Sequence, residues 1–262
     1  MKPIRIVVQG ASGKMGREVV GAVCRDPGTE LVGAVDLNPP GNIFMLPDGG
    51  NVPFLADIEL IIESCRPDVI IDFSTAQASM KAARTALPRG IRLVIGTTGL
   101  SEKDIEEIRA LSQKHKTGAV VAPNFALGAV LMIHLATIAS RFFDSAEIIE
   151  LHHEKKADAP SGTALKTARS MASAREKLFT LPPEKEVMES RGRKVEGVPI
   201  HSVRLPGIIA RQEVIFGGPG QTLSIMHDTT SRESFMPGVM LATKEVVNRH
   251  ELVYGLESLL GL

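Results

Sequence analysis

The chain has 262 residues, enough for one or two domains with sizeable cores, and its 30 basic and 30 acidic residues give a formal net charge of zero. This balance argues against a generic nucleic-acid or acidic-membrane binder, and the scarcity of aromatic residues argues against stacking platforms for bases. The two cysteines, Cys24 and Cys65, form no CxxC pair. We therefore expect a cytoplasmic protein without nucleic-acid or membrane partners.

The first half of the chain alternates short apolar, β-branched runs with helical patterns. The pattern predicts strands over residues 4–8, 30–35, 69–73, 91–95 and 119–121. It predicts helices after residue 16, over 56–65 and 76–86 and from Ser101 onward, and a loop over 37–52. Strands that alternate with helices in this way indicate an α/β fold with a Rossmann-type, doubly wound parallel sheet.

A turn of small residues links the first predicted strand to the first predicted helix. Its members, and the acid that ends the next strand, are Gly10, Ala11, Ser12, Gly13, Lys14, Met15, Gly16 and Asp36. Such a turn permits a tight bend and close approach to a pyrophosphate, while an acid about 20 residues on can bond ribose hydroxyls. The spacing is not a strict G-x-G-x-x-G, so a glycine-rich loop without a ligand stays the alternative. The whole pattern favours a site for NADH or NADPH, and Asp36 favours acceptance of NADH.

Three further strands end in small or polar residues. In an open parallel sheet, ligands bind beyond the carboxyl ends of the strands. Each of these segments alone is typical of an ordinary turn, but together they outline one rim that suits a flat nicotinamide. The candidate cofactor-binding residues on this rim are Phe73, Gly96, Thr97, Thr98, Ala122, Pro123, Asn124 and Phe125.

The second half of the chain predicts a different domain. A long, mostly apolar and therefore buried helix over 127–143 leads into it. Further predicted elements are a strand over 147–151, a helix over 164–174, a charged solvated loop over 182–197, alternating runs over 200–205, 213–216 and 222–227, and helices over 235–248 and 251–260. We expect a dinucleotide-binding domain of residues 1–126 with 234–262. Residues 127–233 then form an α+β substrate-binding and oligomerisation domain with an open mixed or antiparallel sheet.

The segment after the strand over 147–151 is dense in proton donors. It contains His152, His153 and Lys156, followed by Ser161 as a predicted helix cap. A helix N-terminus is a natural cradle for a carboxylate or phosphate, so we expect an anionic substrate here that receives a proton. A solvated lysine loop is the alternative. Metal is not favoured, because adjacent strand residues point to opposite faces and no ligand recurs nearby.

This stretch resembles the His-His-x-x-Lys-x-Asp-Ala-Pro-Ser-Gly-Thr-Ala signature of the dihydrodipicolinate reductase family. The resemblance extends to the Gly-x-x-Gly-x-Met-Gly turn, to Gly-Thr-Thr-Gly from residue 96 and to Asn-Phe at 124–125. It covers nearly the whole chain and is weakest over 39–56 and 177–198. The sequence departs from the family pattern at Ala210, where glycine is frequent, and at Gln212, where histidine is frequent.

The resemblance implies reduction of 4-hydroxy-tetrahydrodipicolinate to tetrahydrodipicolinate with NADH or NADPH, in diaminopimelate and lysine biosynthesis. It implies His152 as proton donor or acceptor and Lys156 as proton donor. It implies carboxylate binding by His153, Ser161, Gly162 and Thr163, and a homotetramer joined through the second-domain sheet. Two alternatives stay open, a related reductase of another imino or amino acid and a non-catalytic dinucleotide sensor.

Overall fold

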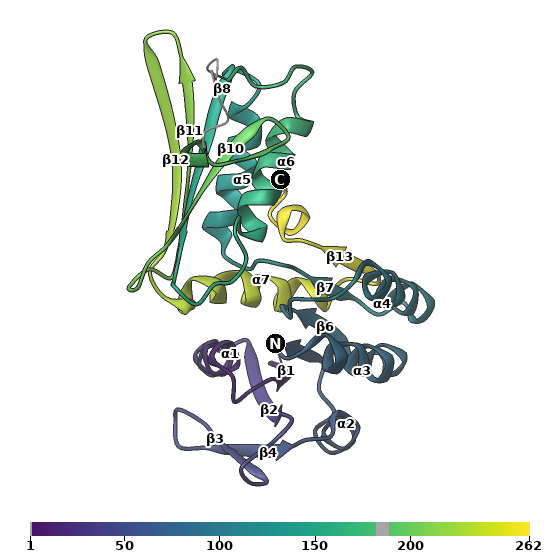
Figure 1. Cartoon of the computed structure of the whole chain (residues 1–262). Helices are drawn as coiled ribbons and strands as arrows, with labels where there is room; N and C mark the ends of the chain where they lie inside the picture. Colours follow the sequence, from purple (N-terminus) through teal and green to yellow (C-terminus); the bar gives the residue numbers. More distant parts are fainter. Residues whose placement is uncertain (1, 182–188) are drawn as a thin grey trace. The chain divides into compact units, whose positions relative to one another are not determined.

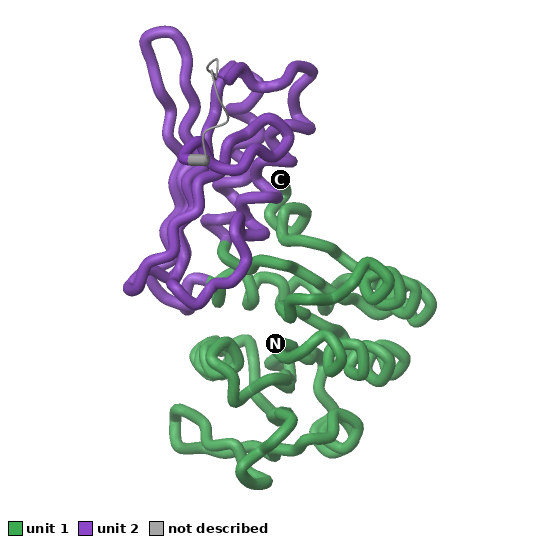
Figure 2. The backbone as a smooth tube through the Cα atoms, in the orientation of Figure 1, with its two compact units in different colours: residues 1–126, 235–262 green, residues 127–234 purple. Residues whose placement is uncertain are grey.

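The computed structural model describes residues 2–181 and 189–262, which form two compact units (Figures 1 and 2). Unit 1 comprises residues 1–126 and 235–262, and unit 2 comprises residues 127–234. Over the described residues, no helix is long and apolar enough to cross a membrane.

Unit 1 is built on an eight-stranded sheet in the order β13-β7-β6-β5-β1-β2-β4-β3, parallel except where β3 pairs with β4. Its strands are β1 (Ile4–Gln9), β2 (Thr29–Val35), β3 (Ile43–Met45), β4 (Asn51–Leu55), β5 (Val69–Asp72), β6 (Arg92–Ile95), β7 (Ala119–Val121) and β13 (Leu252–Tyr254). Its helices are α1 (Lys14–Arg25), α2 (Ile58–Cys65), α3 (Ala76–Ala86), η1 (Leu87–Arg89), α4 (Glu102–His115), α7 (Met236–Val246) and η4 (Glu257–Leu259). Helix α1 packs against α7, and α3 packs against α2 and α4.

The central strands of this sheet are mostly apolar because helices cover both faces, and polar residues stand near their ends. Ile6, Val7 and Val8 in β1 and all four residues of β5 are buried. A capping box begins α4 directly after Ser101, since Ser101 and Asp104 each accept from the other's backbone N–H. The predicted α/β class with a doubly wound parallel sheet is confirmed.

Unit 2 carries a five-stranded mixed sheet in the order β12-β11-β8-β10-β9. Its elements are α5 (Leu127–Ala139), β8 (Ser145–His152), α6 (Gly162–Ser173), η2 (Glu189–Arg191), β9 (Arg193–Val195), β10 (Val198–Arg204), β11 (Ala210–Gly218), β12 (Gln221–Thr229) and η3 (Arg232–Phe235). Strand β8 pairs in parallel with β10 and antiparallel with β11. The sheet is therefore mixed, which settles the alternative left open by the sequence.

The core of unit 2 lies between α5, α6 and one face of this sheet (Figure 1). Along β8, alternate residues point to the helices, so Ala146, Ile148 and Glu150 are buried. Two apolar side chains and one carboxylate thus share a face. The Glu150 carboxylate accepts from the backbone N–H of Ser161, so the end of β8 lies beside the start of α6.

Four expectations about individual elements are corrected by the structure. The predicted loop over 37–52 contains β3 and the start of β4, and the predicted helix over 251–260 is instead β13 followed by a short 3-10 turn. The charged loop predicted over 182–197 lies outside the described residues up to 188, but its remainder forms η2 and β9. Helix α5 is buried on one face only, since Leu131, Leu135 and Ile138 are exposed. The face of α5 that carries these three residues is therefore apolar and exposed to solvent in the single chain.

Candidate functional site

The turn after β1 is shaped for a dinucleotide. Gly10 has φ +78° and its N–H donates to the carbonyl of Val35 at 2.8 Å. A Cβ at Gly10 would lie 2.4 Å from the Phe73 carbonyl oxygen, and one at Gly16 would lie 2.0 Å from the Gly10 carbonyl oxygen. Both positions therefore require glycine, the first also because of its left-handed backbone.

Helix α1 begins directly after this turn with an open N-terminus. Gly13 is the N-cap and supplies no side-chain hydrogen bond, and no acidic residue stands in the first turn. The N–H groups there and the helix dipole favour an anion such as a pyrophosphate. Lys14 and Met15 begin the helix, with Lys14 exposed and Ala11 and Gly16 buried. The turn therefore fits a dinucleotide, and Gly16 lets the first turn of α1 pack closely against Gly10.

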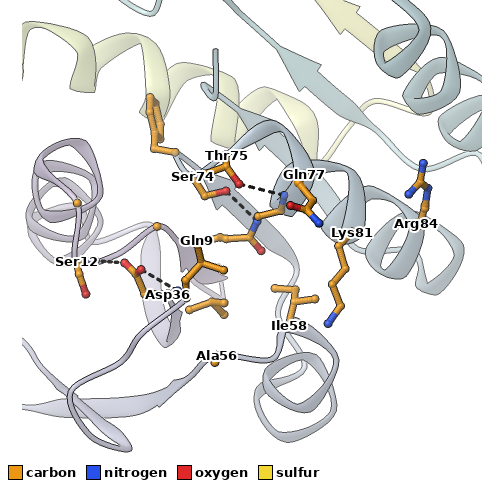
Figure 3. Close-up of a pocket in the computed structure, with 16 residues that line it drawn as sticks. Gln9, Ser12, Asp36, Ala56, Ile58, Ser74, Thr75, Gln77, Lys81 and Arg84 are labelled. Atoms are coloured by element: carbon orange, nitrogen blue, oxygen red, sulfur yellow. Dashed lines mark hydrogen bonds between the residues drawn. The ribbon is translucent and has the colours of Figure 1, made fainter. Parts of the chain in front are cut away.

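Asp36 follows β2 and faces the same turn. Its Oδ2 accepts from the backbone N–H of Ser12 at 2.9 Å, and its Oδ1 accepts from the N–H of Leu37 at 2.8 Å. An ionised carboxylate has about four acceptor positions, so one on each oxygen is left for ribose hydroxyls. Figure 3 shows Asp36 beside Ser12 at the edge of the cavity.

A cavity of about 730 Å³ joins the turn to the ends of β2, β4 and β5 (Figure 3). Five predicted cofactor residues line it, namely Gly10, Ser12, Gly13, Asp36 and Phe73. Ser74, next to Phe73, lines it as well. The lining residues that were not predicted from the sequence as cofactor contacts are Gln9, Val35, Leu37, Ala56, Ile58, Thr75, Gln77, Ala78, Lys81 and Arg84. Several of them follow strand ends or open α3, where an adenosine slot is expected beside a Rossmann-type turn.

Two basic side chains line this cavity, and both are ion-paired. Lys81 Nζ lies 3.4 Å from Asp57 Oδ2, and Arg84 makes a bidentate contact with Glu107, with Nε–Oε1 at 2.6 Å. The hydrogen bond that Arg84 donates to Glu107 raises the pKa of the Arg84 guanidinium. The cations at this cavity thus already have carboxylate partners.

The other predicted rim residues lie outside the lining of this cavity but are connected to Phe73. A Cβ at Gly96 would lie 2.2 Å from the Phe73 ring, and the Phe73 and Phe125 ring centroids are 5.7 Å apart. Asn124 Oδ1 accepts from the backbone N–H of Ala126 at 2.9 Å. Thr98 and Pro123 are exposed, whereas Thr97 and Ala122 are buried.

The buried Asp72 carboxylate organises this rim. Its Oδ1 accepts from the Ser74 N–H at 3.0 Å and from the Ser74 hydroxyl at 2.5 Å, and its Oδ2 accepts from the Ser79 hydroxyl. The Ser74 N–H also donates to Thr97 Oγ1 at 2.9 Å. Complete burial raises the pKa of Asp72. The arrangement fixes the ends of β5 and β6 relative to each other.

The loop of unit 2 begins at His152, the last residue of β8. His152 Nδ1 lies 2.5 Å from Glu150 Oε2, and its side chain is 14% exposed. His153 follows the strand, and its carbonyl accepts from the Lys156 N–H at 3.1 Å, which closes a turn. Lys156 Nζ lies 2.8 Å from Asp158 Oδ1. The proton donors predicted from the sequence therefore lie within one turn of chain.

Helix α6 follows the loop and starts as predicted. Ser161 is its N-cap and accepts at Oγ from the Ala164 N–H at 3.2 Å. Gly162 is the first helical residue, and a Cβ there would meet nothing within 4 Å. The N–H groups of the first turn, which includes Thr163, point out of the helix end and can bind a carboxylate.

Two residues that the sequence left without a role hold this loop, Glu150 and Arg204. Burial tends to raise the pKa of the Glu150 carboxyl, but hydrogen bonds from His152 and Arg204 outweigh it and lower the pKa to about 2. Arg204 NH2 and NH1 donate to Glu150 Oε1 and Oε2 at 2.8 and 3.0 Å. A signal for Glu150 was its spacing two residues before His152 on a strand. Across the described residues, no cluster of three or more His, Cys, Asp or Glu side chains could hold a metal ion.

Comparisons with known proteins decide the family. A model described as dihydrodipicolinate reductase, N-terminus, matches residues 4–125, and one described as dihydrodipicolinate reductase, C-terminus, matches residues 128–260. The chain belongs to the dihydrodipicolinate reductase family. The resemblance inferred from its sequence is thereby confirmed, and the chain is an oxidoreductase with a Rossmann-type unit that implies a nicotinamide cofactor.

Individual relatives match the chain over its full length. The 4-hydroxy-tetrahydrodipicolinate reductase of Dehalococcoides mccartyi is 52% identical over 263 residues and covers 100% of both chains. That of Moorella thermoacetica is 50% identical over 262 residues and covers 98% of both. A solved structure, a dipicolinate-bound dihydrodipicolinate reductase from Paenisporosarcina sp. TG-14, is 42% identical with a TM-score of 0.87, covering 98% of this chain and 99% of that one.

Proposed function

We propose that this protein reduces 4-hydroxy-tetrahydrodipicolinate to tetrahydrodipicolinate with loss of water, in the cytoplasmic pathway to diaminopimelate and lysine. The observation that carries the proposal is the loop of unit 2, which combines His152 and Lys156 with the first turn of α6 at Gly162 and Thr163. A small dicarboxylate needs both features, cationic groups to bind it and an acid to protonate it. The full-length relatives named for this activity support the substrate.

Each group in the loop has a proposed task. The nicotinamide, when bound, supplies the hydride. His152 gives or takes a proton at Nε2, because its Nδ1 is engaged by Glu150. Lys156 donates a proton from Nζ once the substrate is bound. The substrate carboxylates are held by His153, Ser161, Gly162 and Thr163.

The test is hydride transfer followed by the loss of reduced-nicotinamide absorbance with the purified protein. We expect oxidation with the dicarboxylate cyclic imine and much slower oxidation with a cyclic imine that carries one carboxylate or none. Equal rates with all three imines would point to a reductase of broader or different specificity. No oxidation with any of them would contradict the proposed function.

For the cofactor, we propose that NADH binds at least as tightly as NADPH. The charge of Asp36 repels a 2′-phosphate, and the two basic side chains that line the cavity are already paired with Asp57 and Glu107. We expect Asp36→Asn to shift the NADPH-to-NADH affinity ratio towards NADPH by about tenfold, or about 1.4 kcal/mol. Wild-type protein that binds NADPH tenfold more tightly than NADH would refute this proposal.

For the assembly, we propose a homotetramer joined through the sheet of unit 2. The face of this sheet away from α5 and α6 carries apolar residues, which by strand register are Ile149, Leu151, Val203, Ile215 and Met226. Met226 is 52% exposed in the single chain, and apolar patches of this kind mark interfaces. Light scattering should give four times the 28.1 kDa chain mass, and Met226→Glu should reduce it. A monomeric wild-type protein would contradict the proposal.

A further inference from the structure

Glu150 is a charged side chain on the buried face of β8, which otherwise contributes to the hydrophobic core of unit 2. It continues the buried face of β8 after Ala146 and Ile148, and it is 0% exposed. An ionised carboxylate in such a position is strongly destabilising unless every acceptor position is filled. The hydrogen-bond partners of the Glu150 carboxylate therefore indicate its role.

All the acceptor capacity of Glu150 is used within unit 2. Oε2 accepts from His152 Nδ1 at 2.5 Å and from Arg204 NH1 at 3.0 Å. Oε1 accepts from Arg204 NH2 at 2.8 Å and from the Ser161 backbone N–H at 3.3 Å. A carboxylate has about four lone-pair positions, so little acceptor capacity is left for a ligand. Glu150 thus acts on its neighbours rather than on the substrate.

Arg204 extends this contact to the loop itself. Besides Glu150, its guanidinium donates to the carbonyls of Val203 at 2.7 Å, Asp158 at 2.6 Å and Lys156 at 3.3 Å. All five N–H groups of the fork have an acceptor in this arrangement. The backbone on both sides of the proton-donating loop is therefore tied to the same buried carboxylate that holds His152 and the cap of α6.

We infer that Glu150 is a positioning residue that fixes the His152 tautomer and, through Arg204, the backbone of the loop that follows it. A carboxylate only accepts, so the short contact puts the His152 proton on Nδ1 and leaves Nε2 as the atom that exchanges a proton. This inference rests on the proposed role of His152 in the reaction. It assigns to Glu150 an effect on the turnover step rather than on cofactor affinity.

The same sheet offers a matched control cluster. Glu147 Oε2 lies 2.7 Å from His201 Nε2, and Glu147 Oε1 lies 2.6 Å from Arg191 NH2. This cluster also combines a carboxylate, a histidine and an arginine, but alternation along β8 places it on the opposite face of the sheet from Glu150. A general effect of removing a paired carboxylate from this sheet would therefore appear in Glu147→Gln as well, and light scattering checks that this variant keeps the wild-type assembly mass.

The kinetic test compares Glu150→Gln, His152→Gln and the double variant, with Glu147→Gln as control. We expect Glu150→Gln to lower kcat by roughly 10²-fold, as removal of an orienting partner does elsewhere, with NADH affinity unchanged. In the His152→Gln background the same change should cost about twofold or less, because both substitutions remove one function. Any one of three results would overturn the inference. The kcat losses of the two single variants could multiply in the double variant, or the kcat of Glu150→Gln could stay within about twofold of wild type. The third such result is an equal loss of kcat in Glu147→Gln. If Glu150→Gln does not fold, Glu150→Asp keeps the charge but shortens the reach, and the same cycle decides.

A spectroscopic readout separates this inference from the proposed function. With ¹⁵N-labelled histidine, the wild-type protein should show a hydrogen-bonded proton on His152 Nδ1, and Glu150→Gln should lose it. If His152→Gln is fully active, the proposed role of His152 fails, whatever Glu150 does. If His152→Gln is inactive while wild-type His152 carries its neutral proton on Nε2, the proposed function stands and the inference about Glu150 fails.

Discussion

Lys156→Ala is expected to separate catalysis from folding, because the structure assigns little stability to this side chain. Lys156 is 23% exposed and pairs with Asp158, which is 57% exposed. A pair of this kind contributes about 0–1 kcal/mol. The groups of Lys156 that hold the loop are its carbonyl, which accepts from Arg204, and its N–H, which donates to His153. Alanine keeps both, so the free energy of unfolding should change by about 1 kcal/mol or less.

The effect of Lys156→Ala on turnover depends on what the ammonium does. If it donates the proton, kcat should fall by about 10²–10⁴-fold, the usual contribution of a general acid. If it only attracts a carboxylate, the loss should appear mainly in the KM for the imine. The hydrogen bond from Lys156 lowers the pKa of Asp158, so a substrate carboxylate has to compete with an ionised Asp158 for Lys156 Nζ.

Steady-state kinetics, NADH titration and thermal unfolding of Lys156→Ala check this prediction together. Lys155→Ala is the matched control, since Lys155 is exposed and adjacent in the same loop. It should keep a near-normal kcat. A Lys156→Ala protein with near-normal kcat would remove Lys156 from the acid role and leave His152 as the proton donor. Loss of NADH binding in Lys156→Ala would show that the residue supports the fold more widely than its contacts indicate.

Three further predictions follow from single contacts. Gly16→Ala places a Cβ 2.0 Å from the Gly10 carbonyl oxygen, so the turn must open and NADH affinity, measured by titration, should fall at least about tenfold, or 1.4 kcal/mol. Gly162→Ala meets nothing within 4 Å, so the melting temperature should hold while the KM for the imine rises if a carboxylate approaches this backbone closely. Glu150 has its pKa lowered from 4.5 to about 2, so its stabilisation is complete above the unfolded value and is lost as the pH falls through the folded one. Acid titration of the free energy of unfolding should show a loss of about 3 kcal/mol between about pH 5 and pH 2, absent in Glu150→Gln.

Local patterns were sufficient to predict the turn and the acidic residue that line the cavity of unit 1. The turn from Gly10, helix α1, strand β2 and Asp36 lie within about 30 residues and carry their signals in residue type and spacing. The cap at Ser161 was predictable for the same reason, since it precedes the residues whose N–H groups it serves. In both cases the chemistry depends on backbone groups, and these are positioned by residues that lie close to them in the sequence.

Short elements that depend on distant partners could not be predicted. Strand β13 has three residues and exists because Leu252–Tyr254 pairs with β7, more than 130 residues earlier in the chain. The segment lacks the length for a period-two pattern, and its leucines and glutamates favoured a helix. Strand β3 likewise forms only against β4. Long-range pairing, rather than local propensity, decides such segments.

Units 1 and 2 use the carboxylates of Asp36 and Glu150 in opposite ways. This difference explains why the sequence predicted a role for Asp36 but none for Glu150. Asp36 accepts from the backbone N–H groups of Ser12 and Leu37 and lines the cavity, so its proposed role could be inferred from a sequence motif. Glu150 gives all its acceptor positions to protein groups, and its main partner, Arg204, is 54 residues away. A carboxylate that binds a ligand must stay partly open, whereas one that positions a histidine is most effective when its acceptor positions are filled and it is buried. Only the assembled sheet, which brings the ends of β8 and β10 together, distinguishes the second kind from a core residue.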